Sequence, residues 1–168
     1  MKIFIFSLLL SATATAQYNR DSLYNLALQS IYREEFKQAE PHLNRILQEN
    51  PNDSDAIFEL GMINDHLGNR EAAINYFSRY ILLNKKAPDG YFLRGLNYYH
   101  LDREKEALKD LKKALKYEPS NADANFYVAK IYHKLSNDKR ATIFLEKAIL
   151  HNPTNEEYNS FKESIRKI

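Results

Sequence analysis

The sequence predicts an all-α fold: an α-α superhelical solenoid of four helix-turn-helix units, followed by a C-terminal capping helix. The first observation is a column of alanines that recurs every 34 residues, at Ala39, Ala73, Ala107 and Ala141. The second is a small residue at the eighth place of each unit when units start at Arg20, namely Ala27, Gly61, Gly95 and Ala129. The third is that apolar residues recur at three- and four-residue spacings, as in amphipathic helices. A fixed period of this length predicts a stack of similar supersecondary units.

The period defines four consecutive units without insertions. They span residues 20–53, 54–87, 88–121 and 122–155. The small side chains let two helix backbones approach closely, and a bulky apolar residue four places after each alanine fills the space beside them. Turn-forming residues predict the link between the two helices of a unit at Leu67-Gly68-Asn69, Leu101-Asp102 and Ser136-Asn137-Asp138.

Proline stands near the end of three of the four units, where it stops the second helix. These prolines are Pro51, Pro119 and Pro153. The polar residue directly after each one is predicted to cap the next helix: Asn52, Ser120 and Thr154.

Residues 156–168 carry a single apolar stripe at helical spacing. Its members are Tyr158, Phe161, Ile165 and Ile168, with polar residues between them. One apolar face and one polar face predict a terminal capping helix, which a solenoid needs because its last unit has no neighbour.

This pattern of small, aromatic and proline positions in 34-residue units resembles the tetratricopeptide repeat. The resemblance covers nearly all of residues 17–168, which we expect to form one repeat domain. Three residues depart from the family pattern: Tyr80, Lys85 and Arg94. Arg94 occupies a place that is usually apolar, so it is either a buried functional charge or, as we favour, an arginine whose head reaches the surface.

The resemblance implies that the first helices of successive units line a concave groove for an extended peptide or a partner helix. The groove residues expected from it are Tyr24, Phe58, Met62, Phe92, Leu96, Tyr99, Phe126 and Lys130. Aromatic anchors of this kind dominate binding energy when a partner covers them. The alternative, given equal weight, is that these rings pack between adjacent first helices. Some family members bind a C-terminal carboxylate through Lys, Asn and Arg residues, but the corresponding places here are apolar or acidic, which disfavours that ligand.

The first 16 residues have the three parts of a secretory signal peptide. Lys2 is followed by the apolar run 3–10 and then by small residues that end in Ala14-Thr15-Ala16. We therefore expect cleavage between Ala16 and Gln17, export to the periplasm or the medium, and a mature chain without an integral membrane segment. Loss of Lys2 changes the net charge from +2 to +1, which gives no electrostatic case for a nucleic-acid partner.

Residues that could carry chemistry are few. Cysteine is absent, which excludes disulfides and thiol catalysis, and neither phosphate-loop nor hydrolase motifs occur. His66, His100 and His133 recur at similar places in three units, but adjacent repeats are about 10 Å apart, too far for shared metal coordination. We expect no metal and no cofactor. The lysine-rich segment 105–116 alternates with acidic residues and is predicted to be a solvated face.

The sequence therefore predicts a non-enzymatic, exported scaffold that binds a protein or peptide through its aromatic groove. Two other functions stay open. One is architectural self-association or assembly of an envelope complex. The other is a histidine-based metal protein, which the spacing argument disfavours.

Overall fold

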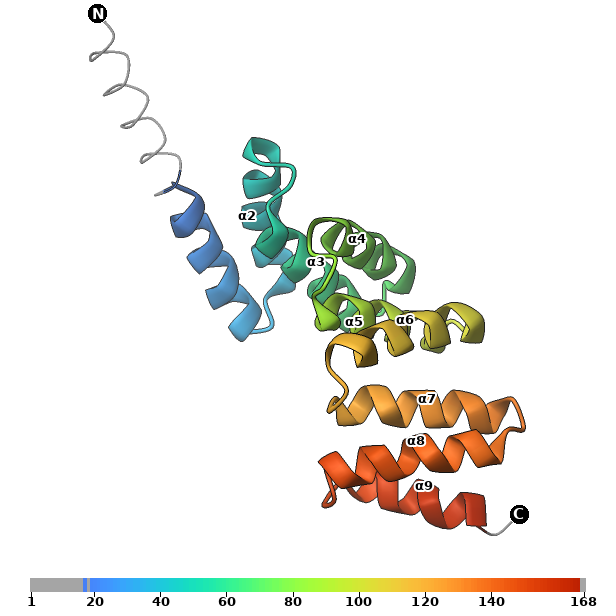
Figure 1. The fold of residues 1–168 in the computed structure, drawn as a ribbon. Coiled ribbons are helices and arrows are strands. Elements are labelled where there is room, and N and C mark those ends of the chain that lie inside the picture. The colour runs from blue at the N-terminus through green and yellow to red at the C-terminus, as the bar shows by residue number, and fades with distance from the viewer. Residues whose placement is uncertain (1–16, 18, 167–168) are drawn as a thin grey trace, which may run out of the picture. The chain divides into compact units, whose positions relative to one another are not determined.

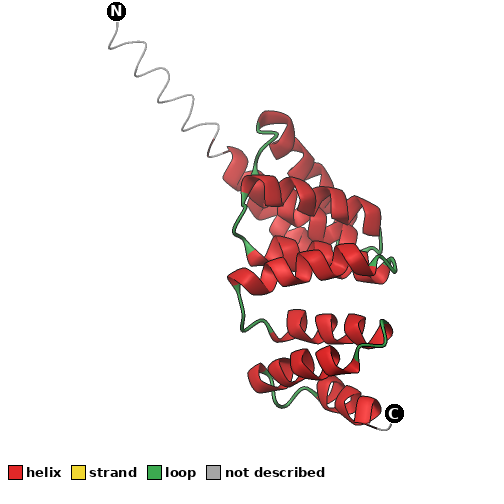
Figure 2. Cartoon of the chain, turned by 45° about the vertical axis from the view of Figure 1, so that its right-hand side comes forward, coloured by secondary structure: helices red, strands yellow, loops and turns green. Residues whose placement is uncertain are grey.

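The computed structural model describes residue 17 and residues 19–166, and these residues form helices and short turns (Figures 1 and 2). Residues 19–32 are helical. The following helices are α2 (Phe36–Glu49), α3 (Ser54–His66), α4 (Arg70–Leu83), α5 (Pro88–His100), α6 (Glu104–Tyr117), α7 (Ala122–Lys134), α8 (Asp138–His151) and α9 (Glu156–Arg166). No strand occurs in the described residues, so the all-α repeat prediction is confirmed.

Two parts of the chain are described separately below. The N-terminal part ends at Ile63. The C-terminal part runs from Asn64, in the last turn of α3, to the C-terminus. The predicted signal peptide, residues 1–16, lies outside the described residues. Within residues 19–166, no helix is both long enough and apolar enough to cross a bilayer.

The turn inside each helix pair places one residue in the left-handed backbone region, and always at the fifteenth place of a unit. These residues are Glu34 (φ 59°), Gly68 (φ 76°), Asp102 (φ 54°) and Ser136 (φ 56°). Only glycine adopts this conformation without a steric cost. The turn is therefore imposed by packing of the helices and not by a glycine in every unit.

Helix capping differs from the prediction by one residue. Asp53, Asn121 and Asn155 accept hydrogen bonds from backbone N–H groups three residues on, at 3.0, 2.8 and 3.2 Å. The predicted capping residues Asn52, Ser120 and Thr154 are wrong, because each lies one place before the residue whose side chain reaches the first turn. Ala87 stands at the equivalent place before α5, where no described side chain caps the helix.

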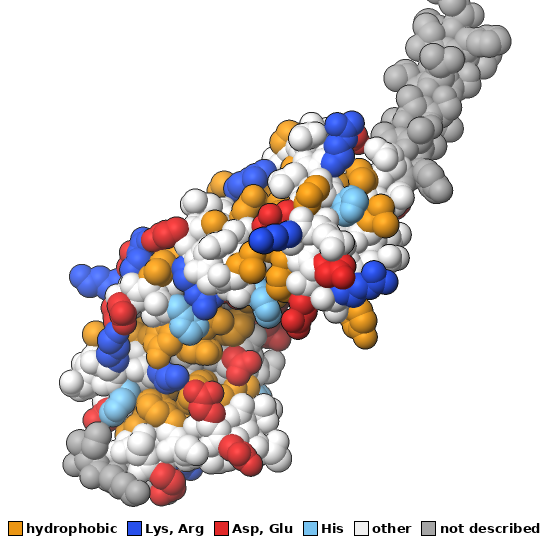
Figure 3. All heavy atoms as spheres, turned by 180° about the vertical axis from the view of Figure 1, so that it is seen from behind, with side chains coloured by type: hydrophobic (Ala, Val, Ile, Leu, Met, Phe, Trp, Pro, Cys, Tyr) orange, Lys and Arg blue, Asp and Glu red, His pale blue; other side chains and the backbone are white. Residues whose placement is uncertain are grey.

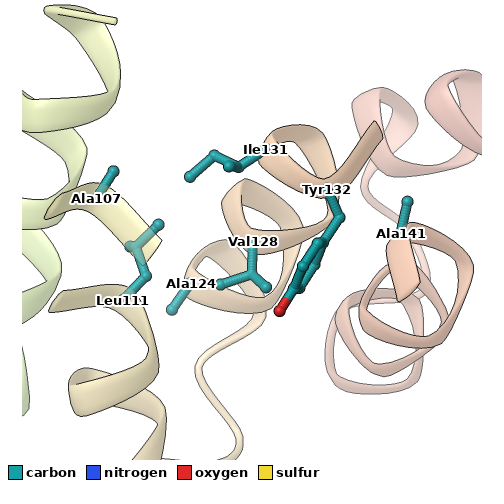
Figure 4. Close-up of a cluster of buried hydrophobic side chains, with 7 residues drawn as sticks. All are labelled: Ala107, Leu111, Ala124, Val128, Ile131, Tyr132 and Ala141. Atoms are coloured by element: carbon teal, nitrogen blue, oxygen red, sulfur yellow. The ribbon is translucent and has the colours of Figure 1, made fainter. Parts of the chain in front are cut away.

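The alanine column forms the centre of the helix packing, and all four alanines are fully buried. In the C-terminal part, one apolar cluster joins α6, α7 and α8 (Figure 4). Its members are Ala107, Leu111, Ala124, Val128, Ile131, Tyr132 and Ala141. The small residues of α6 and α8 bring their backbones close to α7, whose larger side chains fill the space between them.

Arg94 is predicted to reach the surface, but its side chain is only 19% exposed and its head is held in an ion pair. Its guanidinium donates to both carboxylate oxygens of Asp110, at 2.6 and 2.9 Å, and to the Ser78 hydroxyl at 3.0 Å. The Asp110 side chain is only 4% exposed, so the ion pair ties α5 to α6 inside the protein. Gly95 makes room for Asp110, because a Cβ at Gly95 would lie 3.2 Å from the Asp110 Cβ.

Candidate protein-binding surface

The groove residues predicted in the N-terminal part, up to Ile63, lie on the helix of residues 19–32 and on α3. Tyr24 is half-buried, its hydroxyl donates to Glu59 Oε1 at 3.2 Å, and the Arg20 guanidinium lies 4.7 Å from its ring centroid. Phe58 is also half-buried, whereas Met62 is 36% exposed. Burial, followed by the nearby carboxylates of Glu59 and Asp55, raises the pKa of Tyr24 above its usual value, so the phenol stays protonated and acts as a donor.

In the C-terminal part of the chain, the predicted groove residue Tyr99 lies against Tyr127, which is not among the predicted groove residues. The rings of Tyr99 on α5 and Tyr127 on α7 meet edge to face, with centroids 5.1 Å apart. Leu96 is half-buried on α5, and Phe92 packs against the apolar cluster of Figure 4. Each tyrosine is half-buried, so part of each ring remains available to a partner.

Lys130 places a positive charge within this aromatic surface. Its ammonium lies 5.7, 5.5 and 5.2 Å from the ring centroids of Tyr99, Tyr127 and Phe126, within cation–π range. It also donates to Glu157 Oε1 of α9 at 3.3 Å. Burial acts to lower the pKa of Lys130, but Tyr99 and Glu157 outweigh burial and raise it. The lysine is therefore charged at neutral pH.

Phe126, predicted to face a partner, is instead 1% exposed. Its ring lies 4.5 Å from that of Tyr158 and 5.6 Å from that of Phe161, centroid to centroid. Helix α9 covers it, because the capping helix needs a large apolar contact on α7. For this residue, the alternative of packing between helices describes the structure, and Phe126 is not presented at the surface.

We define the aromatic surface as Leu96, Tyr99, Tyr127 and Lys130. Figure 3 shows one face of the molecule on which apolar side chains gather, with histidine and charged side chains beside them. The aromatic surface combines half-buried rings with the charge of Lys130, so it is suited to a partner that offers both an apolar and an acidic group.

Comparison with known sequences establishes the family. Two family profiles, both described as tetratricopeptide repeat, match residues 24–91 and 101–165. The chain belongs to the tetratricopeptide repeat family. A search of curated protein sequences returned no match.

Solved structures show the same fold at low sequence identity. A crystal structure of MamA is 18% identical, with 89% of this chain and 87% of that chain covered and a TM-score of 0.78. YrrB, described as a TPR protein with an unusual peptide-binding site, is 21% identical over 94% of this chain and 89% of its own, with a TM-score of 0.77. The TPR domain of Arabidopsis OM64 is 22% identical over 68% and 94%, with a TM-score of 0.66.

Membership of this family supports the role of a protein-interaction scaffold. Tetratricopeptide repeats bind protein or peptide partners and generally act as scaffolds without catalytic activity of their own. The identities to the solved structures are low, so those structures establish the fold and leave the ligand to be inferred from this chain's own surface.

Two of the three repeated histidines of this tetratricopeptide repeat chain, His100 and His133, lie in different environments. His100 is next to the aromatic surface, with its ring centroid 5.5 Å from that of Tyr99 and 6.4 Å from that of Tyr127. Burial, followed by Arg70 and then Lys130, lowers its pKa although Asp65 opposes them. His133 instead places Nδ1 2.6 Å from Asp138 Oδ1. Among the described residues, no group of three or more His, Asp or Glu side chains could hold a metal ion.

Sequence reasoning missed the contribution of α9 to the surface. Glu157 pairs with Lys130, and Tyr158 donates a hydrogen bond to Asp123 of α7. The N-terminal part of the chain has an equivalent pair, because Tyr24 and Glu59 are also 35 residues apart and hydrogen-bonded. In both parts of the chain, a tyrosine and a carboxylate that are 35 residues apart, one repeat plus one residue, thus join neighbouring helices.

Proposed function

We propose that this protein is an exported tetratricopeptide scaffold that captures a protein or peptide partner on the aromatic surface of α5 and α7. The observation that carries the proposal is the edge-to-face pair of Tyr99 and Tyr127 beside the charged Lys130. Packed helices hold these groups in place, so little conformational entropy is lost when a partner docks. An apolar side chain of the partner would cover the rings, and a carboxylate would replace Glu157 at Lys130.

The test uses photo-crosslinking in intact cells. A photo-reactive amino acid replaces Leu96 in the aromatic surface, and in the control it replaces Leu150, an equally apolar side chain that is 75% exposed on α8. We expect a discrete adduct from position 96, identified by mass spectrometry, and loss of that adduct in the Tyr99→Ala/Tyr127→Ala variant. An adduct that persists in this variant, or one that forms equally from position 150, would contradict the proposal.

The choice of tyrosines over phenylalanines in this test follows from burial. Phe92 packs against the core cluster, so its replacement would weaken the fold together with any binding. Tyr99 and Tyr127 are half-buried, and circular dichroism of the double variant checks that its helix content is retained.

Export is part of the proposal and rests on the sequence of residues 1–16. Lys2, the apolar run 3–10 and the Ala14-Thr15-Ala16 ending support it. The chain purified from the envelope fraction should begin at Gln17. A protein that begins at Met1 and stays in the cytoplasm would exclude export without affecting the binding proposal.

Self-association is a second candidate function, because residues 19–32 expose large apolar side chains. Leu26, Leu28 and Tyr32 are 43%, 37% and 91% exposed. Light scattering distinguishes the two functions: a concentration-dependent dimer that is lost in the Leu28→Ser/Tyr32→Ser variant would favour assembly through this helix.

A further inference from the structure

Helix α6 carries a row of lysines on one face. Lys105, Lys109, Lys112 and Lys116 follow one another at spacings of four, three and four residues, and all four are exposed. This spacing places them on one side of a helix over about 16 Å, at 1.5 Å per residue. We call them the lysine row.

The acidic residues that alternate with these lysines in the sequence do not neutralise them. Each is paired with a cation outside α6: Glu104 with Lys134, Glu106 with Arg103, and Asp110 with Arg94. Within residues 19–165, no carboxylate forms an ion pair with a member of the lysine row. The lysine row is therefore solvated, as predicted for segment 105–116, and the acidic residues of α6 lie on other sides of the helix.

Lys112 connects the row to a buried phenol of α7. Its ammonium donates to the Tyr132 hydroxyl at 2.6 Å, and the Tyr132 side chain is only 6% exposed. The Arg140 guanidinium of α8 lies 5.5 Å from the centroid of the same ring. Lys112 and then Arg140 lower the pKa of Tyr132, although burial opposes them.

The surroundings of Tyr132 are cationic on the α8 side as well. The ring stacks on Phe144, with centroids 5.8 Å apart, and the Lys147 ammonium lies 5.1 Å from the Phe144 centroid. Arg140 and Lys147 are seven residues apart and so occupy one face of α8. Neither of these two cations is paired with a carboxylate in the described part of the chain.

From this geometry we propose that Lys112, Arg140 and the Tyr132 hydroxyl bind a tetrahedral oxyanion of the phosphate type. The phenol oxygen accepts a hydrogen bond from Lys112, and its own proton meets no acceptor among the described residues. An ammonium, a guanidinium and a phenolic proton are three donors, which the four oxygens of a phosphate can accept together. The buried ring fixes the hydroxyl, and the lysine row raises the local concentration of anions.

The test titrates the ¹⁵N-labelled full chain with inorganic phosphate at constant ionic strength and follows amide shifts at residues 112, 132 and 140. We expect saturation with a Kd of about 1 mM or tighter. Lys112→Gln, Arg140→Gln and Tyr132→Phe should each weaken binding about tenfold, because each removes one donor to a charged group. Lys109→Gln is the matched control: it removes the same charge from the same row and should change the Kd less than about twofold.

Two outcomes would decide against the proposal. Shifts that do not saturate, or equal weakening by Lys109→Gln and Lys112→Gln, would overturn it, because either indicates a diffuse field without a site. Vesicles of phosphatidylcholine with and without phosphatidic acid then identify the source of the phosphate. Saturable phosphate binding with co-sedimentation on phosphatidic acid vesicles supports a lipid headgroup, and phosphate binding without it supports a soluble ligand.

Discussion

Two junctions between repeats occupy equivalent places in the chain, 68 residues apart, yet are packed in opposite ways. At the α4–α5 junction, α4 supplies the large Tyr80 and α5 supplies Gly90. At the α8–α9 junction, α8 supplies Ala148 and α9 supplies the large Tyr158. A Cβ added to Gly90 would lie 2.7 Å from Tyr80 Cδ1, and Tyr158 is 1% exposed in the same buried cluster as Ala148.

The loops of the two junctions also differ, because only the loop before α9 has both a helix-ending proline and a capping side chain. Before α9, Pro153 ends the preceding helix and the Asn155 side chain caps the next one. Before α5, Lys85 and Ala87 stand at those places, and no described side chain caps the helix. At these two junctions one large and one small residue meet, and either of the two helices can supply the large one. The departure of Tyr80 from the family pattern is therefore compensated by Gly90.

The largest effect should come from Tyr158→Ala. This change removes a fully buried aromatic ring from between α7 and α9, and we expect the free energy of unfolding to fall by about 3–5 kcal/mol. Tyr158→Phe keeps the ring and removes only the hydroxyl that donates to Asp123, so it should cost about 1 kcal/mol. Urea unfolding measures both. Equal losses in the two variants would mean that the hydrogen bond, and not the volume, secures this junction.

The converse change, Gly90→Ala, should destabilise the α4–α5 junction by about 1–3 kcal/mol, because the new methyl group overlaps the Tyr80 ring. A double-mutant cycle with Tyr80→Ala tests the proposed compensation. In the Tyr80→Ala background only Ile81 Cγ1, at 3.0 Å, still crowds the added methyl group, so Gly90→Ala should cost much less there, with a coupling energy of at least about 1 kcal/mol. Additive effects would contradict the idea that the two positions share one volume.

The sequence was sufficient to predict the helical repeat, because the alanine column and the apolar spacing are properties of single positions. It also predicted that Tyr99 and Lys130 belong to one surface, which the structure brings together on α5 and α7. It did not predict the burial of Phe126, because that depends on where α9 packs. Nor did it predict the Arg94–Asp110 pair, since the arginine is sixteen residues from its partner and a single sequence gives no information on which charges meet.

A smaller effect is expected at the cap of α9. Asn155→Ala removes the acceptor for the Tyr158 N–H, which is 3.2 Å from Asn155 Oδ1, and should cost about 1 kcal/mol. Asn155→Asp keeps an oxygen in the same place and should retain most of the stability. Melting temperatures that fall equally in both variants would indicate that Asn155 acts through another contact.

The smallest expected effect is a gain, and it tests whether the α4–α5 junction only lacks a cap. Ala87 has φ −75° and ψ 111°, close to the φ −63° and ψ 104° of the capping residue Asn121. Ala87→Asn would therefore place a side-chain oxygen near the Gly90 N–H without moving the backbone, and should add about 0.5–1 kcal/mol. Ala87→Gln, which is polar but too long to cap, should add nothing. A gain in both variants would assign the effect to solvation, whereas a gain in Asn alone would mean that the backbone before α5 already has the geometry that a capping side chain needs.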